Sequence, residues 1–204
     1  MSDTDTHSDT YREIGRRPTA EGEARTLLLR RHCAGSVPSA WAACTEPDRL
    51  SRWLHPVTGE LSIGGAYRLE DEAHGEILRC EPPHLLAVTW SQGEGGPATE
   101  VVVRLAPLTE RETAVELEHG PIPDEVEADG RFLDPVLNDA PTGMWGLGTR
   151  WDMVLISLDR YLRGELDEPS AATLDEHSPE VRELADRCGL AWASTVASAT
   201  TNRA

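Results

Sequence analysis

The chain has 204 residues, 36 acidic and 19 basic, with a formal net charge of −17. This length can bury a sizeable core, and we expect one domain with tails. So negative a charge repels phosphate backbones and anionic lipids, which argues against nucleic-acid and membrane-surface partners. No apolar run approaches the roughly 20 residues of a membrane-spanning helix, and residues 1–20 lack the apolar core of a signal peptide, so we expect a cytoplasmic protein.

The cysteines indicate a reducing compartment and no metal site. Cys33, Cys44, Cys80 and Cys188 form no C-x-x-C pair and are expected to be small buried hydrophobic residues. Zinc would need Cys and His clustered at short spacing, which the sequence lacks. It also lacks a nucleophile elbow, a phosphate-binding loop and a dinucleotide fingerprint, so we expect no metal, no cofactor and no recognisable catalytic residue.

The chain is expected to begin with a disordered arm, residues 1–24, because Ser, Asp, Thr and Glu dominate it. A first strand follows from Arg25 to Cys33, in which Leu27 and Leu29 share one face. The arginines in the second half of this strand indicate that it lies near an edge or the surface.

Two short helices are expected next. Ser36 can cap the first, with Pro38 tolerated in its first turn. Thr45 begins a second start signal, and that helix ends at His55, because a residue before proline is pushed out of the α region.

An antiparallel meander should follow, since short alternating runs are separated by turn residues at close, even intervals. Gly64 and Gly65 suit a tight turn, and Pro82 and Pro83 end another run because neither can donate to a ladder. The expected strands are 57–63, 66–72, 74–81, 84–91, 98–106 and 112–119.

The acidic segment 120–147 is long enough to be a lid, a binding loop or a disordered link. The spacing of Trp151, Leu155 and Leu158 then predicts an amphipathic helix over 148–163, which would cover the sheet.

The remaining residues, 166–204, are expected to form a linker and a short tail helix capped by Ser178. The apolar stripe of this helix must pack on the main domain, residues 25–165, or on a second subunit, so a homodimer is one expectation.

This order of elements and several motifs resemble the START-like (SRPBCC, helix-grip) superfamily, and more closely its branch related to activators of the heat shock protein 90 ATPase. The resemblance implies an α+β helix-grip fold, in which a curved antiparallel sheet of about seven strands wraps a long C-terminal helix and leaves a cavity between them. It covers residues 25–164 and is carried by Val37–Trp41, Thr45–Pro47, Arg52–Trp53, Leu61–Tyr67, Gly75–Ile77, Pro82–Pro83, Thr89–Trp90, Leu117–His119 and Gly148–Asp152.

Members of the superfamily bind or transform diverse small apolar molecules, and some act on chaperones. The eukaryotic activators use a second, amino-terminal domain to contact the chaperone, and residues 1–24 are too short to be that domain. The resemblance therefore implies a small hydrophobic ligand rather than a chaperone partner.

If the sheet grips the helix, inward-facing residues would line the cavity, and ligand pockets are mostly apolar with a few polar groups. The alternative is that these residues only fill a core. The candidates are Trp53, Tyr67, Trp90, Val103, Leu117, His119, Met144, Trp145, Trp151 and Leu155.

Two other functions remain open. A cyclase- or hydrolase-like enzyme on the same fold would use His119 as its acid–base group, hydrogen-bonded to a buried polar neighbour inside a pocket. An interaction protein, such as a chaperone partner or a dimeric regulator, would present a broad exposed apolar patch and little cavity.

Overall fold

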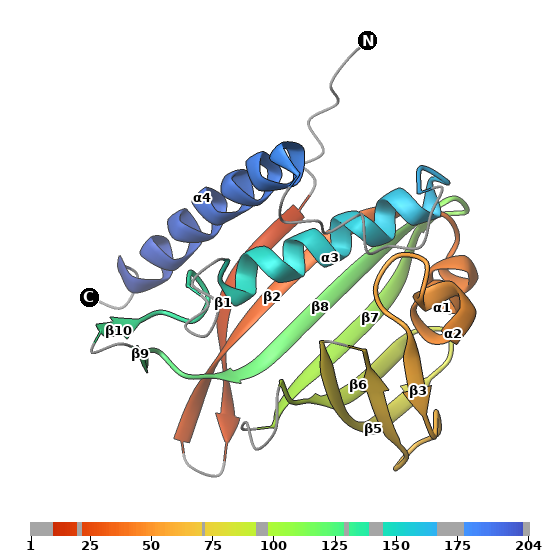
Figure 1. Cartoon of the computed structure of the whole chain (residues 1–204), viewed down its shortest axis with the longest axis horizontal. Coiled ribbons are helices and arrows are strands. Elements are labelled where there is room, and N and C mark those ends of the chain that lie inside the picture. The colour runs from red at the N-terminus through yellow and green to blue at the C-terminus, as the bar shows by residue number, and fades with distance from the viewer. Residues whose placement is uncertain are drawn as a thin grey trace.

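The computed structural model describes residues 10–19, 22–70, 72–92, 98–128, 131–138, 145–166 and 178–201. In these residues an eight-stranded antiparallel sheet is crossed on one face by a long helix, with a second long helix beside it (Figure 1). The helices are α1 (Val37–Thr45), α2 (Pro47–Leu50), α3 (Leu147–Leu162) and α4 (Pro179–Thr201).

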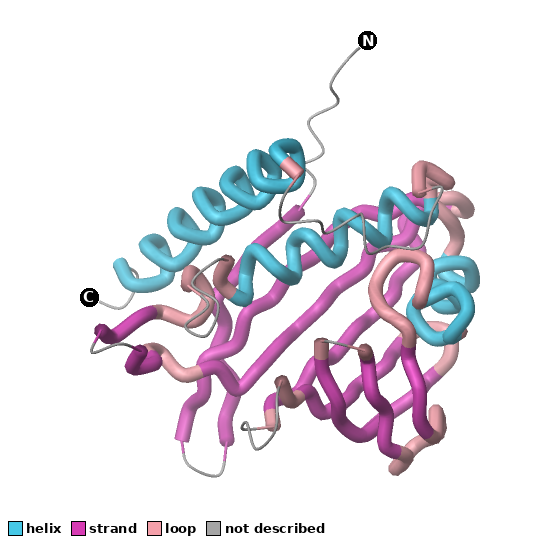
Figure 2. The backbone as a smooth tube through the Cα atoms, in the orientation of Figure 1, coloured by secondary structure: helices cyan, strands magenta, loops and turns pink. Residues whose placement is uncertain are grey.

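The sheet has the strand order β1-β2-β8-β7-β6-β5-β4-β3, and Figure 2 shows it as one curved layer. A separate hairpin of β9 (Val126–Ala128) and β10 (Arg131–Leu133) follows it in the chain. The strands of the sheet are β1 (Thr10–Thr19), β2 (Gly22–Ala34), β3 (Val57–Gly59), β4 (Ala66–Leu69), β5 (Ala73–Glu81), β6 (Leu85–Trp90), β7 (Thr99–Thr109) and β8 (Glu112–Ile122).

The predicted helix-grip fold is confirmed, with eight strands in place of about seven. The meander runs from β3 to β8 in sequence order, and Gly64 turns between β3 and β4 at a φ of +82°, which glycine adopts without strain. Ser36 caps α1 by accepting a hydrogen bond from the Ser39 amide. The second helix is shorter than predicted. Thr45 belongs to the end of α1, Glu46 precedes α2 without a side-chain cap, and α2 ends at Leu50.

The disordered-arm prediction is wrong for Thr10–Thr19, which forms β1 and pairs with β2 along its whole length. Residues 1–9 lie outside the described part of the chain. The strand was missed because its inward side chains include polar ones that find buried partners. The Arg12 guanidinium meets Asp152 at 2.7 Å, and Thr10 accepts a hydrogen bond from Arg31.

The predicted edge position of the first strand is also wrong. β2 lies between β1 and β8, and Arg31 is only 1% exposed. Its charge is balanced by Asp159 of α3, at 3.3 Å. The partner is distant in the sequence, so the sequence alone does not distinguish this buried arginine from a surface one.

Helix α3 is covered on two sides. Trp151, Leu155 and Leu158 belong to the main core under the sheet, whereas Met153 and Ile156 pack in a second cluster that includes α4 residues. The tail helix therefore packs within the chain, and it runs for 23 residues rather than being short. No helix among the described residues has the length and apolar character needed to cross a membrane.

Candidate functional site

An apolar pocket of about 180 Å³ lies between the sheet and helix α3. Its wall comes from the end of α1, α2 and the segment after it, strands β3 to β8, and one face of α3. None of the described residues that line it is charged. They are Cys44, Thr45, Leu50, Trp53, Leu54, Val57, Leu61, Tyr67, Leu69, Ile77, Cys80, Leu86, Val88, Trp90, Val101, Val103, Val115, Leu117, Trp151, Val154, Leu155 and Leu158.

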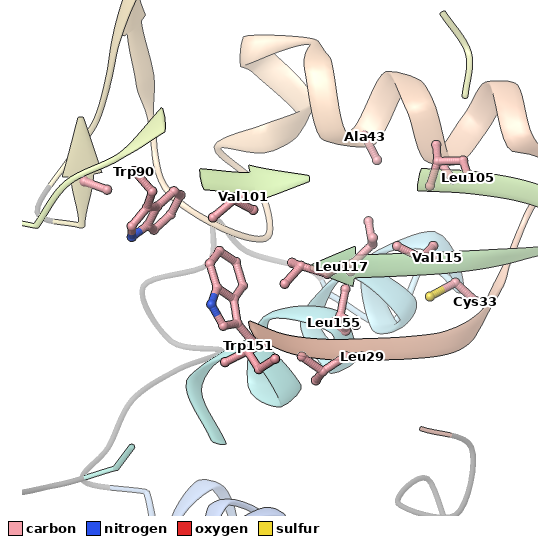
Figure 3. Packing of buried hydrophobic residues seen from close by; sticks show 14 of the residues in the cluster. Leu29, Cys33, Ala43, Trp90, Val101, Leu105, Val115, Leu117, Trp151 and Leu155 are labelled. Carbon is pink, nitrogen blue, oxygen red and sulfur yellow. The ribbon is translucent and has the colours of Figure 1, made fainter. Parts of the chain in front are cut away.

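The aromatic end of this wall is built by Trp90 of β6 and Trp151 of α3 (Figure 3). Their ring centroids lie 5.0 Å apart with the planes tilted by 57°. Tilted packing of this kind is favourable for aromatic pairs, because the positive edge of one ring meets the negative face of another. Val101 and Leu117, on the neighbouring strands, continue the wall from these rings.

The structure brings seven of the ten predicted site residues to the pocket. Six of them lie on the sheet or on α3, the elements between which the helix-grip resemblance places a cavity, and Trp53 lies in the turn after α2. They are Trp53, Tyr67, Trp90, Val103, Leu117, Trp151 and Leu155. Met144 lies outside the described residues.

Trp145 and His119 do not line the pocket. Trp145 precedes α3 and packs beside Met153, Ile156 and Cys188, in the cluster shared with α4. It therefore belongs to the helix–helix contact. His119 is 3% exposed, is not among the lining residues, and is hydrogen-bonded to Trp151, which is one of them.

Both ring nitrogens of His119 are occupied. Trp151 donates from Nε1 to Nδ1 at 2.8 Å, and Thr99 Oγ1 lies 2.7 Å from Nε2. An indole nitrogen only donates, so Nδ1 is the acceptor and the proton of the neutral ring sits on Nε2, donating to Thr99. Thr99 in turn donates to the Trp90 carbonyl at 2.9 Å. Burial, helped by the positive charge of Arg17, lowers the pKa of His119 from 6.5 to about 4.

Three polar side chains of the lining, those of Trp53, Tyr67 and Thr45, are also engaged by the protein. Trp53 Nε1 donates to the Ala43 carbonyl at 3.0 Å, and the Tyr67 hydroxyl donates to the Thr89 carbonyl at 2.8 Å. The Thr45 hydroxyl donates to the Trp41 carbonyl, one helical turn back, at 2.8 Å. These side chains therefore present mainly carbon to the pocket.

Of the segment from the end of α1 to the β3–β4 turn, sequence reasoning placed only Trp53 in the pocket. Leu50 and Leu54 line it as well, and their four-residue spacing within the second predicted helix was the available signal. Leu61 lines the pocket while remaining 43% exposed, which places the mouth of the pocket beside it. None of the described residues of segment 120–147 lines the pocket, and residues 129–130 and 139–144 lie outside the described part of the chain.

Part of that segment is instead held against strand β2, away from the pocket. Arg25 donates two hydrogen bonds to the carboxylate of Asp134, at 2.9 and 2.8 Å, and Arg25 is 4% exposed. In the described part of the chain, no group of three His, Cys, Asp or Glu side chains is placed to hold a metal ion.

CalU16 from Micromonospora echinospora is similar to this chain, with 34% identity over 93% of this chain and 96% of CalU16, and a TM-score of 0.73 to its solution structure. The crystal structure of CalU16 gives 32% identity, 92% and 98% coverage and a TM-score of 0.66. A family model described as activator of Hsp90 ATPase homolog 1-like protein matches residues 36–136. The chain belongs to this family.

Other members of the fold are more distant. EF2215 from Enterococcus faecalis, a conserved protein of unknown function, is 14% identical over 89% of this chain and 91% of its own, with a TM-score of 0.55, so it shares the fold alone. No curated protein matches the chain. The family model ends at residue 136, before α3, whereas the match to CalU16 extends over most of the chain.

Proposed function

We propose that this Hsp90 ATPase activator-like family member binds a small apolar molecule in the pocket between the sheet and α3. The observation that carries the proposal is the pocket of about 180 Å³, whose lining, among the described residues, contains no charged side chain. Membership of a START-like family, a fold class that includes ligand-binding domains, supports the same function. The proposed contacts are those of Trp53, Tyr67, Trp90, Val103, Leu117, Trp151 and Leu155.

The driving force is burial of apolar surface. Removing apolar surface from water contributes about 25 cal/mol per Å², before the costs of association are subtracted. An empty apolar space also leaves its wall without contacts on one side, so an occupant restores dispersion attraction that the folded chain lacks. Because the pocket is formed by the folded core, little ordering of the wall opposes binding.

The enzyme alternative receives no support from the geometry of His119. A general acid or base must reach the group whose proton it transfers. Here both ring nitrogens bond to protein partners, and the ring is not part of the pocket lining. Chaperone activation is not proposed, and a homodimer stays a prediction.

The test is native mass spectrometry of freshly purified protein, with Val103→Phe as the pocket-filling variant. Val103 lines the pocket, whereas Ala106, on the same strand, is exposed. We expect one small molecule per chain, lost in Val103→Phe and kept in the control Ala106→Phe. The proposal fails if the wild-type chain is empty and also forms no 1:1 complex with added toluene, naphthalene or decanoate. The same spectra report the number of subunits.

A further inference from the structure

The chemistry of the pocket wall restricts what it can hold. Trp53, Tyr67 and Trp151 line the pocket, yet each directs its polar hydrogen to a protein acceptor. Trp90 Nε1 is buried and has no partner among the described residues. The wall therefore offers a ligand aromatic faces, alkyl groups and one indole donor, that of Trp90.

The pocket wall also disfavours a charged ligand. Among the described residues, the lining contains no Arg, His, Asp or Glu that could pair with a charged ligand. Cys44 and Tyr67 of the lining stay neutral near pH 7, because burial raises the pKa of Cys44 to about 12 and raises that of the Tyr67 hydroxyl as well. Burying a carboxylate or an ammonium without a partner is far costlier than burying a neutral group.

The volume limits the size of the ligand. An apolar cavity of about 150 Å³ holds benzene in another protein. The pocket here, at about 180 Å³, is slightly larger. Four aromatic side chains in its wall, Trp53, Tyr67, Trp90 and Trp151, favour a planar ring over an alkyl chain, since paired rings attract each other beyond what their buried area gives.

We propose that the ligand of this pocket is an uncharged compact molecule, a single ring with short alkyl substituents, whose buried part makes at most one hydrogen bond, to the indole nitrogen of Trp90. This inference rests on the proposed function and narrows it to one chemical class. Fatty acids, charged aromatic acids and multi-ring compounds fall outside that class. Any other polar substituent fits only at the mouth, beside the partly exposed Leu61.

The experiment compares matched compounds by isothermal titration and by the indole ¹H–¹⁵N signals of the protein. Toluene, benzoate and benzylammonium share one ring and differ in charge, whereas toluene, naphthalene and pyrene differ in size. We expect toluene to bind 1:1 at least tenfold more tightly than either ion and than pyrene. The signal of Trp151 should shift, and Val103→Phe should abolish binding.

The outcomes separate this inference from the proposed function. If benzoate, decanoate or pyrene binds more tightly than toluene and Val103→Phe removes that binding, the ligand class is wrong while the pocket remains a binding site. A charged or multi-ring molecule recovered with the purified protein would likewise show that the ligand class is wrong and that the pocket is a binding site. If no compound binds and none is recovered with the protein, the binding function itself fails.

Discussion

Trp151 of α3 donates a hydrogen bond to His119 of β8 over 2.8 Å, joining the helix to the sheet at the aromatic end of the pocket. The ring of His119 lies edge-on to that of Trp151, with centroids 5.6 Å apart. The bond fixes the proton of His119 on Nε2 and holds the indole in the pocket wall. His119 therefore acts as a positioning residue for Trp151, and a ligand meets the tryptophan rather than the histidine.

This role predicts a pH dependence of stability. The pKa of His119 falls from 6.5 to about 4 on folding, so between these values the unfolded chain binds a proton that the folded chain does not. The contribution is fully present above pH 6.5 and is lost as the pH falls toward 4. Between pH 7.5 and 5 we expect the free energy of unfolding to fall by about 2 kcal/mol more in the wild type than in His119→Gln, which lacks the titrating ring.

Urea unfolding of both proteins at the two pH values measures this difference. The Gln variant keeps every carboxylate, so it subtracts their contribution to acid destabilisation. Parallel pH profiles for the two proteins would contradict a buried neutral histidine.

A second prediction concerns Asp152, which is fully buried and joins three elements. It accepts two hydrogen bonds from Arg12 of β1, at 2.7 and 2.9 Å, and one from Trp192 of α4, at 2.8 Å. Asp152→Asn keeps the shape but removes the charge that balances Arg12. Breaking a buried ion pair in this way costs about 3–5 kcal/mol, because the remaining charge stays buried.

The matched control is Asp124→Asn. Asp124 pairs with Arg16 at 3.2 Å, but its side chain is 64% exposed, and such surface pairs contribute at most about 1 kcal/mol. Chemical denaturation should therefore separate the two variants clearly. Equal losses of stability would mean that Asp152 does not hold β1 and α4 on α3.

A third prediction compares two helical glycines. A Cβ at Gly148 would lie 2.6–2.8 Å from three ring atoms of Trp192, which is fully buried and cannot move aside. Gly148→Ala should therefore destabilise the fold by roughly 1–3 kcal/mol, although alanine is the better helix former. At Gly189 the nearest atom to an added Cβ is Thr149 Oγ1 at 3.6 Å, so Gly189→Ala should stabilise it by about 0.5–1 kcal/mol. Thermal unfolding measures the change in stability of each variant, and changes of the same sign in both would contradict the prediction.

The sequence predicted the parts of this structure that depend on local pattern. Alternation in β5 to β8, the Ser36 cap and the helical spacing of Trp151 and Leu155 each follow from neighbouring residues. Once the family resemblance supplied the arrangement of sheet and helix, these patterns also identified seven of the pocket residues. Tyr67 and Trp53 were found in this way although they lie on different elements.

What the sequence missed depends on pairs of distant residues. Arg12 and Asp152 are 140 positions apart, and neither reads as buried until both are placed together. Arg31 and Asp159 repeat this at the next strand. Trp145 was assigned to the pocket because an apolar side chain before a helix can turn toward either of its covered faces, and α4 was not expected to cover one of them.

The last prediction links stability to ligand range through two buried leucines. Leu117 is 2% exposed and lines the pocket, whereas Leu27, in β2, is fully buried but not part of the lining. Truncating either to alanine should cost about 2–5 kcal/mol, from lost burial and the cavity that remains. Only Leu117→Ala enlarges the pocket, so only this variant should gain affinity for naphthalene relative to toluene. Isothermal titration of both variants with naphthalene and toluene measures this change in relative affinity. An equal gain in Leu27→Ala would show that the Leu117 side chain does not limit the size of the ligand.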